Sequence, residues 1–255
     1  RHFRVCPPDG HDARPDVNGI RSREGLSRGA RRAFTLVEML SVCGVIFLLA
    51  ALFLPALSRA RLAADNTRCL SNLRQLGLAT QLYWDDHGRT FAERTLRTNG
   101  GWRYWFGWLA DGTEGEREFR AQESPLWPYL TGRGVEICPS LNRTSPRFKS
   151  KARGAAFGYA YNLQVGPRQH PGLRPSAFRN PSSLALFTDG GQINDFQSPA
   201  SPEHPLLEEF YYFDTHPLSA TVHFRHSHRA QVYFADGHVL PEPPAPSSED
   251  RRLSD

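Results

Sequence analysis

An apolar run near the start of the sequence constrains this chain more than any other feature of its 255 residues. Residues 34–57 read FTLVEMLSVCGVIFLLAALFLPAL and contain a single charged side chain, Glu38. As a helix that rises about 1.5 Å per residue, the run reaches about 36 Å, which is enough to cross the hydrocarbon core of a bilayer. No A-x-A-like cleavage site follows it, so a retained anchor fits better than a secretory signal peptide. We therefore expect a transmembrane helix over residues 34–57.

The positive charge of the chain is concentrated before this run. Residues 1–33 contain eight arginines and four acidic residues, so the totals of 31 basic and 26 acidic residues leave 23 and 22 downstream. The rest of the chain thus lacks the basic excess typical of nucleic-acid-binding proteins. Arg28, Arg31 and Arg32 lie next to the apolar run. By the positive-inside tendency they predict a cytoplasmic N-terminus, with everything after residue 57 outside the cytoplasm.

The carboxylate of Glu38 has two interpretations. A charge inside an apolar membrane helix costs several kcal/mol unless it has a partner, so such a residue usually marks a function. Alternatively, Glu38 lies at the membrane interface in the first helical turn, where an acidic side chain complements the helix dipole. The residue by itself favours neither interpretation.

Residues 31–38, RRAFTLVE, resemble the processing site of type IV pilins and type II secretion pseudopilins. In that family a prepilin peptidase cuts on the cytoplasmic side, directly before the aromatic residue, and methylates the new N-terminus. The resemblance implies cleavage between Ala33 and Phe34, methylation of Phe34, and pairing of Glu38 with the terminal amine of a neighbouring subunit. Residues 1–33 would then be a cleaved basic leader. The family nearly always has Gly before the cut, so Ala33 predicts slower cleavage.

The helix is expected to continue over residues 58–88 as an amphipathic segment. Apolar residues recur there at steps of three, four or seven, which predicts one buried stripe. The stripe consists of Leu62, Cys69, Leu73, Leu76 and Tyr83. Gly88 follows as a suitable C-cap. The pilin resemblance implies that this half of the helix packs on the sheet of a globular head.

Residues 89–240 are expected to form that head, which makes the chain an α+β protein with a long helix on an antiparallel β-sheet, as in pilins. Short apolar segments between Pro-, Ser-, Asn- and Gly-rich stretches predict strands at 135–138, 157–161, 184–188, 210–213, 220–224 and 231–234. Residues 89–135 have few strand signals and predict an irregular insertion. Residues 241–255 have too little apolar content to fold and predict a disordered tail.

Aromatic residues gather in the predicted insertion. They are Trp102, Tyr104, Trp105, Phe106 and Trp108. We interpret them as packing, although the same residues, if exposed, would offer a surface for stacking sugars. That possibility supports the alternative function of a membrane-anchored binding protein for carbohydrate or DNA.

Residues 225–240, RHSHRAQVYFADGHVL, place His226 ten positions before Asp236. Asp236-Gly237 predicts a two-residue hairpin turn, which requires two positive φ angles. The His-x9-Asp-Gly spacing resembles the C-terminal box of a prepilin-like family from planctomycete and verrucomicrobial genomes. Other matching segments are CLSNLRQLGLA at 69–79, ICPS at 137–140, YAYN at 159–162, and PSS at 181–183 leading to Asp189. Where that family has Gly-Gly after the His-Ser pair, this chain has His228-Arg229.

Histidine and carboxylate side chains near this box raise the question of a metal. The candidate ligands are His226, His228, Asp236 and Asp189, with His223 and His238 close in sequence. Oxygens of Asp189, Asn194 and Asp195 would suit calcium. No HExxH, EF-hand or paired-thiolate pattern supports a site, so we interpret the His and Asp of the box as structural groups that stabilise turns.

Two of the four cysteines are candidates for a disulfide. Cys6 lies in the leader and Cys43 in the apolar run, which leaves Cys69 and Cys138 in the segment expected to face an oxidising compartment. The sequence does not give the short Cα separation that a bridge requires.

These features predict a non-enzymatic structural subunit, a minor pilin or pseudopilin of a type IV pilus or type II secretion-like filament. It would span the inner membrane once, with its head in the periplasm or outside the cell. The expected partners are a prepilin peptidase and the N-terminal helices of other subunits, without nucleic acid or a cofactor. A tethered metal hydrolase is a third hypothesis, but no Gly-x-Ser-x-Gly, P-loop or nucleotide-binding motif is present.

Overall fold

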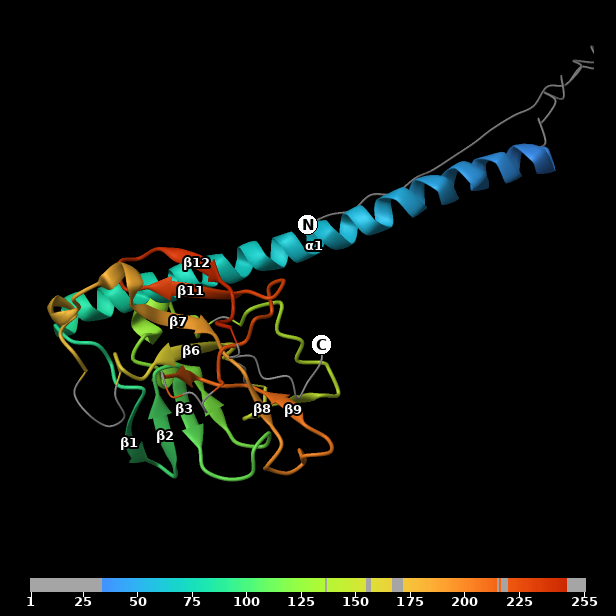
Figure 1. Cartoon of the computed structure of the whole chain (residues 1–255). Helices are drawn as coiled ribbons and strands as arrows, with labels where there is room; N and C mark the ends of the chain where they lie inside the picture. Colours follow the sequence, from blue (N-terminus) through green and yellow to red (C-terminus); the bar gives the residue numbers. More distant parts are fainter. Residues whose placement is uncertain are drawn as a thin grey trace, which may run out of the picture. The chain divides into compact units, whose positions relative to one another are not determined.

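A single long helix precedes all of the β-structure (Figure 1). The computed structural model describes residues 34–135, 137–154, 157–166, 172–214, 216 and 220–246. The predicted leader, with Ala33 and Cys6, lies outside these residues. The described chain is an α+β protein, as expected, and it divides into two units, residues 1–51 and 52–255.

Helix α1 (Leu36–His87) has a defined start and end. At the start, the backbone N–H and Oγ1 of Thr35 donate to Oε2 of Glu38 at 2.8 and 2.9 Å, and the N–H of Glu38 donates to Thr35 Oγ1 at 3.2 Å. This reciprocal pair is a capping box, which satisfies donors that the first turn leaves free. At the end, Gly88 has a φ of 65° and its N–H donates to the carbonyl of Trp84, so the predicted C-cap is confirmed.

The first part of α1 exposes apolar side chains on all sides. Every residue from 34 to 64 is exposed, and the most apolar 18-residue window of the helix has no buried residue. The helix continues through Pro55. By length and composition it could cross a membrane, as the sequence predicts.

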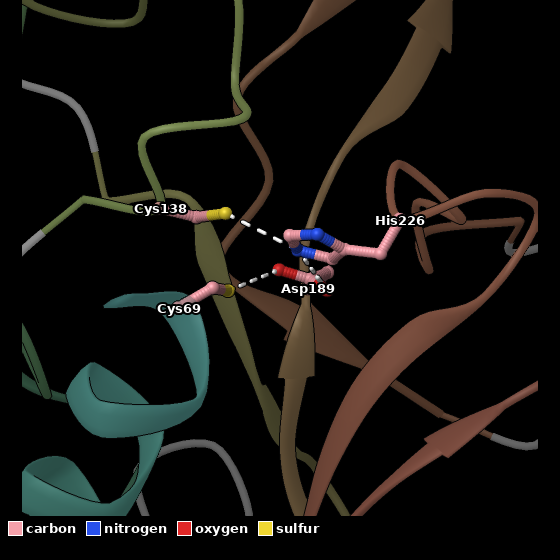
Figure 2. A group of neighbouring side chains, drawn as sticks. All are labelled: Cys69, Cys138, Asp189 and His226. Atoms are coloured by element: carbon pink, nitrogen blue, oxygen red, sulfur yellow. Dashed lines mark hydrogen bonds and ion pairs between the residues drawn. The ribbon is translucent and has the colours of Figure 1, made fainter. Parts of the chain in front are cut away.

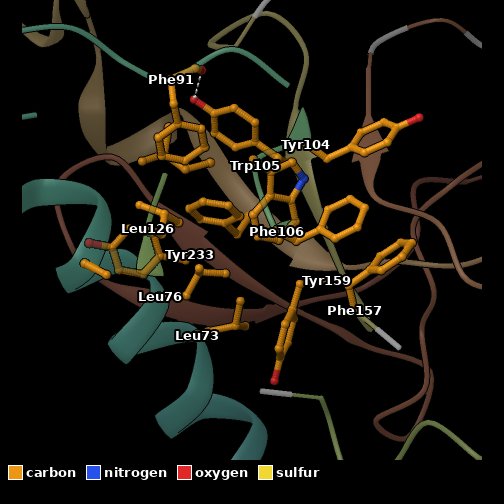
Figure 3. Packing of buried hydrophobic residues seen from close by; sticks show 14 of the residues in the cluster. Leu73, Leu76, Phe91, Tyr104, Trp105, Phe106, Leu126, Phe157, Tyr159 and Tyr233 are labelled. Atoms are coloured by element: carbon orange, nitrogen blue, oxygen red, sulfur yellow. Dashed lines mark hydrogen bonds between the residues drawn. The ribbon is translucent and has the colours of Figure 1, made fainter. Parts of the chain in front are cut away.

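The second part of α1 packs on β-structure through one face (Figure 3). Cys69, Leu73 and Leu76 of the predicted stripe are buried, but Leu62 is 68% exposed. The buried stripe therefore begins at Cys69, about two helical turns after Leu62. Gly77 lies in the same face, and a Cβ there would overlap the ring of Tyr233.

A five-stranded sheet receives this face of the helix. Its order is β10-β6-β7-β11-β12, with β10 parallel to β6 and the other neighbours antiparallel. The strands are β6 (Tyr159–Asn162), β7 (Ala185–Asp189), β10 (Tyr212–Phe213), β11 (Ala230–Phe234) and β12 (Val239–Glu242). Four of the predicted strands thus coincide with observed ones.

Two other predicted strands are wrong. Val135, Ile137 and Cys138 have no regular secondary structure, and of the segment 220–224 only Val222 forms an isolated bridge, with Gly190. Within the described residues of these stretches only Cys138 and Thr221 are buried, and a short apolar segment alone does not make a strand.

The segment 89–135 is more regular than its sequence predicts. It contains an antiparallel four-stranded sheet. The strands are β1 (Arg94–Thr98), β2 (Gly101–Tyr104), β3 (Gly107–Ala110) and β4 (Phe119–Arg120). The glycines in these strands interrupt the apolar pattern that predicts strands, yet the fold requires them. A Cβ at Gly101 would meet the carbonyl of Leu109, and Gly107 has a φ of 148°.

The aromatic residues of this segment pack inside the protein. Tyr104, Trp105, Phe106 and Trp108 are 0 to 7% exposed, and Trp102 is half-buried. The interpretation as packing is therefore confirmed for these residues, and the stacking surface for sugars loses its basis.

A third sheet is mixed rather than antiparallel. It has the order β5-β9-β8, with β5 (Phe148–Lys149) parallel to β9 (Leu206–Glu208) and β8 (Gln192–Asn194) antiparallel to it. The head is therefore not antiparallel throughout as expected, since β5–β9 and β10–β6 are parallel pairs. The predicted tail also starts too early, since β12 includes residues 241 and 242; residues 247–255 lie outside the described residues.

Gly77→Ala tests the close approach of helix and sheet. The added methyl must displace the Tyr233 ring, so we expect a loss of about 1–3 kcal/mol in the free energy of unfolding despite the better helix propensity of Ala. Chemical unfolding of the full chain in detergent, followed by tryptophan fluorescence, measures this loss. Gly44→Ala is the control because nothing lies within 4 Å of its Cβ; equal stability of the two variants would contradict the prediction.

Candidate functional site

Four side chains that are far apart in the sequence meet beside α1 (Figure 2). They are Cys69, Cys138, Asp189 and His226, and their sulfur, oxygen and nitrogen ligand atoms all lie within 4.8 Å of one another. The two cysteines and Asp189 are 0% exposed and His226 is 9% exposed. We refer to these four residues as the tetrad.

The helix and the segment before Cys138 bring the two thiols together. Cys69 lies on the buried face of α1. Three residues later, Nδ2 of Asn72 donates to the carbonyl of Ile137 at 3.2 Å. Since residues three apart share a helix face, this bond holds Cys138 next to Cys69.

Asp189 is the last residue of β7, in the middle of the five-stranded sheet. Its backbone position pairs with Tyr159 of β6, and its Oδ2 accepts a hydrogen bond from the N–H of Gln231 in β11 at 2.8 Å. Gln231 also reaches the helix, because its Nε2 donates to Oδ1 of Asn66 at 2.7 Å. The carboxylate is thus fixed by both neighbouring strands.

A tight turn positions His226. The N–H of His226 donates to the carbonyl of Arg229 at 3.0 Å, and the N–H of Arg229 returns the bond at 3.1 Å. The two residues between them, Ser227 and His228, have φ angles of 52° and 59°. Two positive φ angles in a two-residue turn identify type I′, which usually contains Gly or Asn.

The side chains of the tetrad contact one another in pairs. The Cys69 thiol donates to Asp189 Oδ1 at 3.3 Å. The Nε2 atom of His226 lies 3.3 Å from Cys138 Sγ and also 3.3 Å from Asp189 Oδ2. One imidazole nitrogen therefore faces both the second thiol and the carboxylate.

Two further residues support the tetrad. The hydroxyl of Tyr159 lies 3.4 Å from Cys69 Sγ. Nε of Arg225 lies 3.7 Å from Asp189 Oδ1, and its Nη2 donates to the carbonyls of Gly158 and Gly190 at 3.1 and 2.5 Å. The guanidinium, whose side chain is 3% exposed, gives the buried carboxylate a positive partner.

The electrostatics of the tetrad separate its two thiols. The interaction with the neighbouring Cys69 thiol lowers the pKa of Cys138 to about 5, against the effect of burial and with help from His226. The same interaction, together with burial, raises the pKa of Cys69. Burial would lower the pKa of His226, but hydrogen bonds with Asp189 and Cys138 raise it to about 9. Burial likewise opposes ionisation of Asp189, yet Arg225 and His226 hold its pKa below the usual value.

A cysteine, a histidine and an aspartate in contact also suggest a hydrolase triad, but the geometry differs from one. In a triad the nucleophile and the carboxylate bind opposite nitrogens of the imidazole. Here Cys138 and Asp189 share Nε2, and Cys138 is fully buried. A cysteine-hydrolase triad therefore gains no support from this arrangement.

The candidate metal ligands predicted from sequence separate into two groups. His226 and Asp189 belong to the tetrad. His228 is exposed in the type I′ turn, and Asp236 is exposed beyond β11, where its Oδ1 contacts Nδ1 of His238 at 2.5 Å. The five residues of β11 separate the two ends of the His-x9-Asp-Gly box by roughly 16 Å.

The turn predicted at Asp236-Gly237 is present in a different form. Gly237 has a φ of 97°, but Asp236 is not among the described residues with positive φ. The N–H of Phe234 donates to the carbonyl of His238, and the N–H of Gly237 to that of Phe234, both at 3.0 Å. Residues 235–237 therefore form a three-residue hairpin loop, and the two-residue primed turn lies instead at Ser227-His228.

The oxygens considered for calcium do not share one site. The carboxylate of Asp189 faces the thiols and His226, whereas Nδ2 of Asn194 donates to Glu208 at 3.0 Å. Oδ1 of Asn194 accepts from two backbone N–H groups, and Asp195 follows β8 at a half-buried position.

The sequence offers Cys69 and Cys138 as disulfide candidates, but no local pattern connects either cysteine with Asp189 and His226. Both thiols are free in the structure, although they are adjacent. The signal that could have joined all four residues is that each falls in, or directly follows, a segment singled out above for its resemblance to prepilin-like proteins.

A second buried charged cluster is an ion-pair network. Nζ of Lys149 lies 2.6 Å from Glu114 and 3.1 Å from Glu208, and Nζ of Lys151 lies 3.3 and 3.0 Å from the same two carboxylates. Each of the two carboxylates thus has two cations beside it, and the network serves to join β5 and β9.

Comparison of the chain with protein-family models, curated proteins and solved structures finds no match.

The type I′ turn before β11 generates a stability prediction. A left-handed conformation costs a residue other than Gly about 1–3 kcal/mol, part of which a glycine offsets by its greater freedom in the unfolded chain. We expect His228→Gly to raise the free energy of unfolding by about 1 kcal/mol. His228→Ala keeps the Cβ and is the matched control. Thermal and chemical unfolding of both variants would contradict the prediction if the Gly variant were no more stable than the Ala variant.

Proposed function

We propose that the protein is a prepilin-type structural subunit, anchored in the inner membrane by the first part of α1 and processed by a prepilin peptidase. The observation that carries the proposal is a helix that starts at Leu36, within the RRAFTLVE segment, and continues with exposed apolar side chains. The head, by this proposal, is outside the cytoplasm.

The exposed apolar surface of α1 supports an anchor. Residues such as Leu36, Phe47 and Leu57 are 68 to 82% exposed, a state that is unfavourable in water. A helix that is apolar on all faces is typical of a membrane span or of a helix packed among other helices. A filament subunit needs both environments, the first before assembly and the second after it.

The capping box is compatible with both interpretations of Glu38. Its Oε2 receives two hydrogen bonds from Thr35, so the carboxylate stabilises its own helix. A carboxylate has about four lone-pair sites, so capping leaves capacity for an amine of a neighbouring chain. Glu38 would then have a local role in the monomer and an intermolecular role in the filament.

Processing is the direct test. In a host with a prepilin peptidase, we expect the membrane-extracted protein to begin with N-methylated Phe34, because Phe34 is exposed and helix α1 starts two residues after it. N-terminal mass spectrometry measures this. Ala33→Gly should increase the processed fraction. An uncut segment 1–33, or a cut after Leu57, would overturn the proposal.

Substitutions at Glu38 separate its two roles. Glu38→Gln keeps the hydrogen-bonding pattern of the capping box but removes the charge, whereas Thr35→Ala removes the cap but keeps the charge. If Glu38 pairs with a terminal amine, the Gln variant should insert normally and lose at least about tenfold in co-assembly, since a paired charge contributes more than 1.4 kcal/mol. Thr35→Ala should affect assembly less. Crosslinking of helices in membranes measures assembly; the reverse order of effects would assign Glu38 to capping alone.

A further inference from the structure

We propose that the tetrad of Cys69, Cys138, Asp189 and His226 binds one zinc ion, as a structural site that joins the helix to the sheet. This inference is independent of the processing and assembly proposed above, because every ligand lies in the second unit of the chain.

The geometry of the tetrad fits tetrahedral coordination. Zinc binds sulfur at about 2.3 Å and nitrogen or oxygen at about 2.0 Å, so neighbouring ligand atoms of a tetrahedral site lie about 3.3–3.8 Å apart. Three separations between these side chains are 3.3 Å: Cys69 Sγ to Asp189 Oδ1, Cys138 Sγ to His226 Nε2, and His226 Nε2 to Asp189 Oδ2. Cys69 and His226 thus face different oxygens of the same carboxylate. All remaining separations are within 4.8 Å. Small side-chain adjustments would bring these atoms to one centre.

The position of the imidazole is the most informative detail. Each nitrogen of an imidazole ring has either one hydrogen or one lone pair in the ring plane, so it cannot satisfy two partners fully by hydrogen bonding. Yet Nε2 of His226 faces both Cys138 Sγ and an oxygen of Asp189 at equal distances. Ligand atoms that converge in this way point toward a common centre, which is the arrangement of a metal site (Figure 2).

The chemistry of the ligands selects zinc. Two thiolates and an imidazole are borderline-soft ligands that suit zinc, whereas calcium and magnesium prefer sets of oxygens. The tetrad offers one carboxylate only. Four protein ligands with no exposed position form a closed site, which is typical of structural rather than catalytic zinc.

Charge and second-shell contacts are consistent with an ion. Two thiolates, one carboxylate and a divalent cation have a net charge of −1, and the Arg225 guanidinium next to Asp189 neutralises it. The Tyr159 hydroxyl can donate to Cys69 Sγ, and the N–H of Gln231 donates to Asp189. Such bonds orient ligands in known metal sites. The cysteines bind as thiolates and His226 as neutral imidazole, so their protons pass to solvent when zinc enters.

Cobalt spectroscopy and thiol chemistry on the full chain in detergent test the site. Chelator-treated protein, titrated with cobalt(II) chloride, should reach one equivalent with the visible bands of tetrahedral cobalt and thiolate-to-cobalt charge transfer. Zinc sulfate should displace the cobalt, protect Cys69 and Cys138 from alkylation, and raise the melting temperature. Protein isolated without added chelator should contain one zinc per chain by elemental analysis.

Variants locate the ion. Cys138→Ser and His226→Gln should each weaken zinc binding by more than tenfold, and Tyr159→Phe by about tenfold. Cys43→Ser and His228→Gln should bind as the unmodified chain does, because both residues are exposed and outside the tetrad. Equal loss in these controls would place the ion elsewhere and overturn the proposal.

Two results with the unmodified chain would also overturn it, and neither depends on a variant that folds. One is a Cys69–Cys138 disulfide, found by non-reducing mass mapping of protein taken directly from membranes. The other is a pair of free thiols that zinc does not protect, without a tetrahedral cobalt spectrum. A lack of N-terminal processing in the same preparation would bear on the proposed function alone.

Discussion

The packing of the second part of α1 on the five-stranded sheet is the interaction on which the rest of the fold depends. The helix contributes Leu73 and Leu76 to the core, and Gly77 lets the ring of Tyr233 reach the helix backbone. Burial of each such apolar side chain stabilises the fold by about 1.5–3 kcal/mol. Since the same helix continues into the exposed apolar segment, the head and the proposed anchor share one uninterrupted element.

The tetrad lies at one end of this interface and ties it together in a different way. Its ligands come from the helix, the segment before Pro139, the centre of the sheet and the turn before β11. Apolar packing is tolerant of small shifts, whereas side chains that must meet at one point fix the relative position of all four segments. Arg225 and Gln231 strengthen this by bonding the carboxylate from the same turn and strand. Apolar packing thus supplies most of the stability, and the tetrad fixes the relative positions of the four segments.

Much of the helix and four of the five strands of the main sheet could be predicted from the sequence. The limits of α1, its C-cap at Gly88 and the strands β6, β7, β10 and β11 follow from local patterns of apolar residues and turn formers. The four-stranded sheet did not, because Gly101 and Gly107 are required by close packing that only the folded chain reveals. The parallel pairs β10–β6 and β5–β9 join segments far apart in the sequence, and no local pattern encodes them. The sequence predicts the candidate site in two separate pieces, Asp189 and His226 as metal ligands and the two cysteines as a disulfide. Proximity in sequence groups His226 with His228 and Asp236, whereas the structure groups it with Asp189 and the two cysteines.

The His-x9-Asp-Gly spacing has a consequence for how the sequence of this protein can change. The spacing corresponds to a turn, one strand of five residues and a second turn, with the tetrad at one end and the hairpin at the other. Side chains alternate between the faces of a sheet, so an insertion or deletion of one residue in β11 would exchange its two faces and turn Tyr233 away from Gly77. The nine-residue spacing between His226 and Asp236 is thus set by the length of a strand that must connect two fixed points. The fold can accommodate substitutions within this spacing, but not a change in its length.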